Sequence, residues 1–116
     1  MKKDAEVFLR HIIESVCRIQ EFTIGISKEK FMKDIKLQDA VLRRIEIIGE
    51  AAKNIPLDFR EKHANIPWNE MARTRDKLIH GYFGVDLELT WNIIKEDLPD
   101  LKEKIEKILK QMQAKE

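Results

Sequence analysis

The 116-residue sequence contains only four glycines, three prolines and one cysteine. So few helix-breaking residues, together with many Lys, Glu, Leu and Ile residues, predict an all-α protein. The single cysteine, Cys17, excludes an internal disulfide bond and is typical of a reducing cytosol. A chain of this length suffices for one domain and not two, so we expect a single helical domain over residues 1–116.

The sequence also lacks a strong charge of one sign and a long apolar run. Its formal net charge is +1, although 37% of its residues are charged. A protein that holds nucleic acid by bulk electrostatics is usually far more basic, so any RNA contact must come from a local patch. No segment approaches the ~20 apolar residues of a membrane span. Because Asp4, Glu6 and Arg10 interrupt any signal-peptide pattern, we expect a cytoplasmic protein.

Apolar residues recur at helical spacing in several segments. We expect helices over about 3–24, 28–55 with a break near Asp34, 57–63, and from 67 to 79 or 80. Gly25 and Pro56 can end helices, and Ser27 can cap the start of one. Gly49 and Ala51 are small, so another backbone could approach the second helix closely there.

The segment 87–112 has the most regular pattern. Its apolar residues alternate by four and three without a slip: Leu87, Trp91, Ile94, Leu98, Leu101, Ile105, Ile108 and Met112. Because this seam keeps its phase across Pro99, we expect one kinked helix rather than two. Together the segments predict a compact up-down bundle of about four to five helices.

Residues 75–82, Arg-Asp-Lys-Leu-Ile-His-Gly-Tyr, carry the most chemistry. On a helical wheel Arg75 shares one side with five apolar or aromatic residues: Trp68, Met71, Ala72, Ile79 and Tyr82. A permanent charge on an apolar stripe is costly unless it meets an anion or a dimer partner. This segment is therefore the place to look for function.

RNA cleavage without a metal needs a base, an acid and a cation that stabilises charge on the phosphorane. Histidine suits the proton transfers because its pKa lies near neutrality, and arginine suits the phosphoryl oxygens because its guanidinium is planar and always charged. Arg75 and His80 supply both types. Asp76 lies four residues before His80, so on a helix it would neighbour and orient the imidazole. Arg73 and Lys77 are candidates for binding the RNA backbone.

The spacing of Arg75 and His80 leaves several readings open. Five residues along an ideal helix turn about 140°, so the two side chains would point in different directions. The helix could end before His80, the long arginine could close the gap, or two subunits could share the cleft; the apolar surroundings of Arg75 favour the shared cleft. In a purely structural reading, Arg75 pairs with a buried carboxylate and His80 caps the helix. Glu50 is a candidate for a carboxylate that pairs with an arginine inside the bundle.

Three stretches of the chain resemble the HepT-like branch of the HEPN superfamily. They are residues 66–86, which contain the Arg-x-x-x-x-His-x-Tyr motif, residues 43–53 (Arg-Arg-Ile-Glu-Ile-Ile-Gly-Glu-Ala-Ala-Lys), and residues 91–101 with Asp-Leu-Pro-Asp-Leu. The resemblance implies a homodimeric helical bundle that acts as a metal-independent endoribonuclease toxin, with the motif lining a cleft between subunits. It implies that Arg75 and His80 are catalytic, and that a small nucleotidyltransferase antitoxin attaches AMP to Tyr82.

One position departs from the superfamily pattern, which often has asparagine directly after the motif arginine, where this chain has Asp76. Its negative charge would weaken RNA binding, or it would serve His80 as argued above. We therefore expect a toxin that uses no cofactor or metal, acts on RNA such as tRNA or mRNA, and partners with an MNT-type nucleotidyltransferase. The alternatives are a non-enzymatic helical module that binds such a nucleotidyltransferase, and a purely structural dimer.

Other residues rank below this motif. His11 and Glu14 have a spacing that a metal site in a bundle could use, but no second pair completes it. His63 is expected in an exposed short helix. Trp68 and Trp91 lie on apolar stripes and are expected in the core.

Overall fold

The computed structural model describes residues 2–79 and 84–114, and most of these residues are helical. The elements are α1 (Lys2–Thr23), α2 (Lys28–Lys33), α3 (Ile35–Asn54), α4 (Leu57–Lys62), α5 (Trp68–Leu78), α6 (Leu87–Asn92), a π-helical turn (Ile93–Asp97) and α7 (Leu98–Ala114). The prediction of an all-α bundle is confirmed. None of the described helices is both long and apolar enough to cross a membrane.

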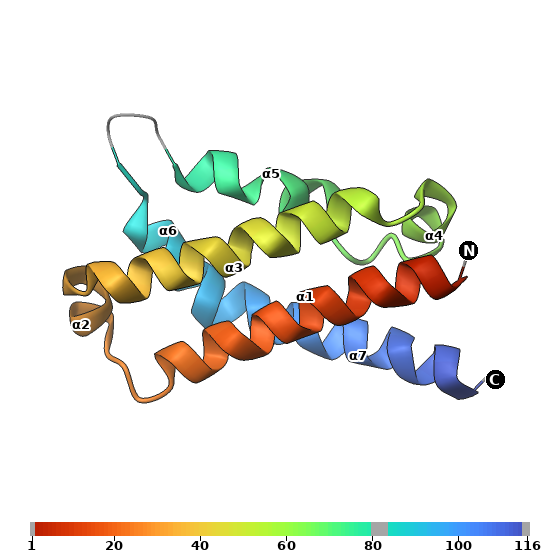
Figure 1. Ribbon diagram of the computed structural model, residues 1–116, viewed down its shortest axis with the longest axis horizontal. Coiled ribbons are helices and arrows are strands. Elements are labelled where there is room, and N and C mark those ends of the chain that lie inside the picture. Colours follow the sequence, from red (N-terminus) through yellow and green to blue (C-terminus); the bar gives the residue numbers. More distant parts are fainter. Residues whose placement is uncertain (1, 80–83, 115–116) are drawn as a thin grey trace.

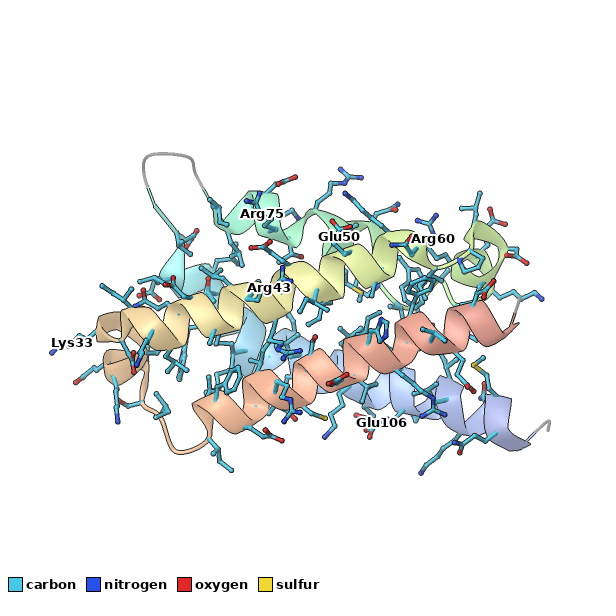
Figure 2. All side chains as sticks on the ribbon, viewed as in Figure 1. Lys33, Arg43, Glu50, Arg60, Arg75 and Glu106 are labelled. Atoms are coloured by element: carbon cyan, nitrogen blue, oxygen red, sulfur yellow. The ribbon has the colours of Figure 1, made fainter. Side chains whose placement is uncertain are left out.

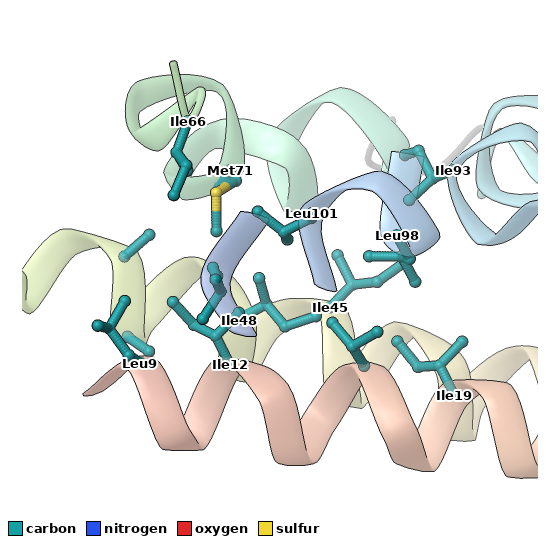
Figure 3. Packing of buried hydrophobic residues seen from close by; sticks show 14 of the residues in the cluster. Leu9, Ile12, Ile19, Ile45, Ile48, Ile66, Met71, Ile93, Leu98 and Leu101 are labelled. Atoms are coloured by element: carbon teal, nitrogen blue, oxygen red, sulfur yellow. The ribbon is translucent and has the colours of Figure 1, made fainter. Parts of the chain in front are cut away.

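The long helices α1 and α3 lie side by side, with α5 on the other side of α3 and α7 packed against α1 (Figure 1). One hydrophobic core joins them. Figure 3 shows how side chains from α1, α3 and α7 meet in it, among them Leu9, Ile12, Ile19, Ile45, Ile48, Leu98 and Leu101. Removal of these apolar side chains from water is the main force that holds the bundle together.

Polar caps separate the first three helices at the predicted residues. Gly25 follows α1 with a φ of +71°, a left-handed conformation that glycine adopts without strain. The hydroxyl of Ser27 accepts a hydrogen bond from Lys30 N at 3.1 Å, which caps α2. The carboxylate of Asp34 accepts one from Leu37 N at 3.0 Å, which caps α3. Asp34 is therefore the predicted break between the two helices.

The chain stays helical from 87 to 114, so the prediction of one continuous helical segment is confirmed. It contains a π-helical turn directly before Pro99, in which Leu98 N–H donates to the carbonyl of Ile93, five residues back. A proline ring clashes with the carbonyl four residues earlier and lacks a donor of its own, so this wider turn lies where an α-helical ladder would be broken. The seam residues Ile94, Leu98, Leu101, Ile105 and Ile108 are buried within the chain.

Helix α5 packs closely on α3 because Gly49 has no side chain. A Cβ at Gly49 would lie 3.0 Å from the carbonyl oxygen of Met71 and 3.5 Å from that of Ala72. The predicted close approach of another backbone is thus confirmed at this glycine. Helix α5 then ends at Leu78, slightly earlier than predicted, because Ile79 has the extended angles φ −105° and ψ 116°.

Candidate functional site

Arg75 lies in the last turn of α5, beside α3, and its side chain is 52% exposed (Figure 2). Trp68 and Met71, which the wheel placed on the same side as Arg75, are buried, and so is Leu78. The arginine itself does not lie among apolar side chains, because the α3 residue opposite it is the polar Glu46. The charge therefore meets an anion within the single chain and does not require a dimer partner.

Two carboxylates flank the guanidinium of Arg75. The Nε atom lies 3.8 Å from Oε2 of Glu46, and Nη1 lies 3.5 Å from Oδ1 of Asp76. These distances describe ion pairs rather than close hydrogen bonds. Glu50, the partner considered from sequence, does not play this role: it is exposed and pairs with Lys53 at 3.8 Å. The arginine's partner on α3 is Glu46, one helical turn earlier.

Sequence reasoning missed Glu46, although a signal was present. Glu46 lies three residues before Gly49, and residues three apart share one face of a helix. Gly49 was already expected to face another backbone. If α5 is taken as that backbone, the spacing places Glu46 on the face of α3 that is directed toward α5.

A groove of about 330 Å³ lies between α3 and α5 at this point. It is lined by Glu46, Gly49, Glu50, Lys53, Ala72, Arg75 and Asp76. A second groove of about 270 Å³ lies between α3 and α1, and Glu46 and Glu50 line it too. Figure 2 labels Arg75 on α5 and both Arg43 and Glu50 on α3. The exposed face formed by α1, α3 and α5 thus carries both signs of charge.

The other motif residues divide into those that the structure places and those that it does not. Arg73 and Lys77 are exposed on α5, and no ion pair engages either of them within residues 2–79 and 84–114. His80 and Tyr82 lie outside the described residues. The expected contact between Asp76 and His80 requires a helix that continues to residue 80, whereas α5 ends at Leu78; the relation of the two side chains lies outside the described residues. Of the three readings of the spacing, the structure has the helix that ends before His80.

The residues on either side of 80–83 are fixed to one another. Ile79 and Val85 form an antiparallel bridge, and Asp86 N–H donates to the carbonyl of Leu78 at 2.7 Å. Ile79 N–H in turn donates to the carbonyl of Arg75 at 3.0 Å. The residues that flank 80–83 therefore lie side by side, next to the backbone of Arg75.

The two tryptophans are confirmed as packing residues. Trp68 is buried, and its indole N–H donates to the carbonyl of His63 at 3.0 Å. Trp91 is half-buried and packs on Phe31 with ring centroids 5.3 Å apart. The short helix α4 has no buried residue, as expected, and His63 is its C-cap. His63 itself is half-buried, and its ring lies 4.5 Å from that of Phe59, centroid to centroid.

The remaining candidates do not form a site. His11 is exposed on α1 and meets Phe8 edge-on. Within the part of the chain that the structure describes, no three His, Cys, Asp or Glu side chains gather in a way that could hold a metal ion. Asp97 is the last residue of the π-helical turn and is largely exposed. The partial burial of its carboxyl raises its pKa, and the negative charges of Glu96, Glu70 and Asp100 raise it further.

Comparison with known proteins gives a consistent result. A family model described as "Ribonuclease HepT-like" matches residues 12–108. The Methanocaldococcus jannaschii protein named "Gamma-glutamylcyclotransferase and putative RNase MJ0434" is 54% identical over 112 residues, which cover 97% of this chain and 50% of that protein. The Thermococcus cleftensis protein named "Probable ribonuclease HepT" is 54% identical over 110 residues, which cover 95% of this chain and 100% of that protein. No solved structure gives a significant match. The chain belongs to the HepT-like ribonuclease family.

Proposed function

We propose that this protein is an endoribonuclease whose catalytic residues are Arg75 and His80. Membership of the HepT-like family and the names of both relatives support RNA cleavage. The observation that carries the site is the position of Arg75: a half-exposed guanidinium at the edge of a groove, hydrogen-bonded through its backbone to the residue that precedes His80. We propose that Arg75 and His80 act on the same RNA phosphate.

In the proposed reaction His80 handles protons and Arg75 stabilises charge. A base removes the proton of an RNA 2′-hydroxyl, whose oxygen attacks the adjacent phosphorus. The bond from phosphorus to the 5′-oxygen breaks, and an acid donates a proton to that leaving oxygen. The guanidinium of Arg75 donates hydrogen bonds to the phosphoryl oxygens as negative charge develops on them. The products are a 2′,3′-cyclic phosphate and a 5′-hydroxyl, and no metal takes part.

One imidazole cannot be base and acid in the same step, which supports a cleft shared between two subunits. In a homodimer, His80 of one subunit would act as base and His80 of the partner subunit as acid. The packing of the single chain does not itself support a dimer. The apolar seam of α7 is buried within the chain, and Arg75 has an ion-pair partner, Glu46, within the chain. The family resemblance is the support for the homodimer.

The proposal includes control by a partner. We propose that the protein is the toxin of a pair, and that an MNT-type nucleotidyltransferase silences it by adding AMP to Tyr82. Arg73 and Lys77 would contribute positive charge for the RNA backbone in a protein whose net charge is only +1. Asp76 would act in support, by constraining the guanidinium of Arg75, its neighbour at 3.5 Å.

The test is cleavage of RNA by the purified protein and by Arg75→Ala and His80→Ala variants. Each substitution should reduce cleavage by about 10²-fold or more while leaving the thermal unfolding curve unchanged. Arg18→Ala is the matched control, because it removes an exposed arginine on α1 that pairs with Glu21 and should cleave normally. Full activity of Arg75→Ala or His80→Ala would overturn the assignment.

Two further measurements address the remaining parts of the proposal. Cleavage should continue in EDTA, and loss of activity on chelation would contradict the metal-independent reaction. Light scattering at micromolar concentration should give the mass of a dimer, and a monomer would contradict the shared cleft. A protein that binds the nucleotidyltransferase but never cleaves RNA would favour the non-enzymatic alternative.

A further inference from the structure

The register between α3 and α5 places Glu46 opposite Arg75. The backbone of α3 at Gly49 closely approaches the backbone of α5 at Met71 and Ala72. Glu46 is one turn before Gly49, and Arg75 is one turn after Ala72. Because the helices run in opposite directions, one turn back on α3 meets one turn forward on α5. The ion pair between Glu46 and Arg75 is thus a consequence of how the two helices pack.

Glu46 is the most sheltered of the three carboxylates in the groove. Its side chain is 35% exposed, compared with 72% for Glu50 and 79% for Asp76. A charge that is partly removed from water is screened less by solvent and salt. Glu46 is also carried by the middle of a long helix, so its position is fixed by the core beneath it. Asp76 lies nearer to the guanidinium, at 3.5 Å compared with 3.8 Å for Glu46, but it is far more exposed to solvent.

The two carboxylates engage different atoms of the guanidinium. Glu46 lies against Nε, and Asp76 lies against Nη1. A guanidinium has five N–H donors, and neither contact is as short as a close hydrogen bond. Arg75 therefore keeps donors for an incoming phosphoryl oxygen while the two carboxylates flank it.

The charges that line the groove oppose a phosphate. Glu46, Glu50 and Asp76 contribute three negative charges, and Lys53 and Arg75 contribute two positive ones. A phosphate that approaches Arg75 meets the field of Glu46 and competes with it for the same cation. The carboxylate that orients the arginine therefore also weakens its hold on RNA.

We propose that Glu46 is a positioning residue that acts through Arg75, orienting the guanidinium for catalysis at the expense of RNA affinity. The inference rests on the proposed function, since it takes Arg75 as the group that contacts the phosphate. It predicts that loss of the Glu46 charge changes turnover and affinity in opposite directions. A residue with a merely structural role would lower the folded fraction and reduce kcat without tightening binding.

The experiment compares Glu46→Gln with Glu50→Gln. Both changes remove one negative charge from the same groove and keep the size of the side chain, but only Glu46 pairs with Arg75. Cleavage kinetics give kcat and KM, and fluorescence anisotropy gives the Kd for a 2′-O-methyl RNA, which cannot form a cyclic phosphate. For Glu46→Gln we expect kcat to fall about tenfold, because a misplaced catalytic group is costly. We expect its Kd to fall about three- to fivefold, which is the scale of a partly exposed ion pair.

The matched variant and a double mutant separate the effect on Arg75 from the general loss of charge. Glu50→Gln should leave kcat and Kd within about twofold of the native protein, since exposed charges interact weakly. In an Arg75→Ala background, Glu46→Gln should no longer tighten binding. Glu46→Asp, which keeps the charge, should recover part of the lost kcat.

The possible outcomes are distinct. Unchanged or weaker binding by Glu46→Gln overturns the proposal, and so does tightening that persists without Arg75. A normal kcat for Glu46→Gln overturns the positioning role. If Arg75→Ala cleaves RNA normally, the proposed function itself fails, while the Kd values still show whether Glu46 and Arg75 are coupled.

Discussion

Gly49 of α3 and Met71 of α5 approach so closely that a single added carbon would disturb them: a Cβ at Gly49 would lie 3.0 Å from the Met71 carbonyl oxygen. Gly49→Val should therefore push α5 away and cost about 1–3 kcal/mol of unfolding free energy, the usual penalty for overpacking. Urea denaturation measures this loss. Gly49→Ala should lose less, because alanine gains about 1 kcal/mol of helix propensity over glycine. A valine variant as stable as the native protein would show that α5 shifts freely.

Ser15 offers a way to stabilise the fold. Its side chain is fully buried in α1, and within the described structure its Oγ has no hydrogen-bond partner. A buried hydroxyl without a partner is unfavourable, so Ser15→Ala should raise the unfolding free energy by about 1 kcal/mol. Thr23→Val is the opposite control, because the buried hydroxyl of Thr23 donates to the carbonyl of Ile19 at 2.8 Å, and its loss should lower stability. Equal effects of the two substitutions would contradict this account.

Asp97 should make the stability depend on pH. Burial and the charges of Glu96, Glu70 and Asp100 raise its pKa above the ordinary value of 3.8, so the folded chain binds this proton more tightly than the unfolded chain does. Stability from this group is present below pH 3.8 and is lost as the pH rises through the raised pKa. Asp97→Asn should therefore raise Tm at pH 7 and have little effect at pH 3.

The control for this prediction is Glu106→Gln, which removes an exposed carboxylate of α7 and should leave Tm nearly unchanged at both pH values. Circular dichroism melts provide the measurement. If Asp97→Asn raised Tm by the same amount at pH 3 as at pH 7, the removal of a negative charge would not be the cause of the increase.

Tyr82 is the expected point of control. AMP on its hydroxyl would bring a phosphate close to the residues on either side of 80–83, where it would compete with RNA for Arg75. Co-expression with a cognate nucleotidyltransferase should add the mass of one or more AMP groups to the motif peptide and abolish cleavage. Tyr82→Phe should remain an active RNase that the nucleotidyltransferase no longer silences. AMP found on a different residue would remove this mode of control and leave the RNase assignment in place.

Local sequence signals predicted most of the helical architecture. The side chains of Ser27 and Asp34 each accept a hydrogen bond from a backbone N–H three residues later. The caps and the break between α2 and α3 can therefore be predicted from residues that are close together in the sequence. The seam of 87–112 is equally local, since it depends on spacing within one segment. These features need no knowledge of how the helices pack.

The ion pair between Glu46 and Arg75 could not be predicted in the same way. It depends on the register between two helices, which is fixed where Gly49 meets the backbone of Met71 and Ala72. The π-helical turn before Pro99 and the end of α5 at Leu78 likewise depend on how backbone donors are satisfied in the folded chain. From sequence, Glu50 was the candidate carboxylate for an arginine inside the bundle, whereas the α3 carboxylate that pairs with Arg75 is Glu46, one turn earlier.

The bridge between Ile79 and Val85 ties the end of α5 to the start of α6 through the backbone. Asp86 N–H adds a hydrogen bond to the carbonyl of Leu78, so these contacts between the two ends of the connection do not depend on the identity of a side chain. Lengthening such a connection is cheap, since each doubling of a flexible loop costs about 0.6 kcal/mol of closure entropy. We therefore expect relatives of this chain to tolerate longer connections at this point, between two helices that keep their relative position.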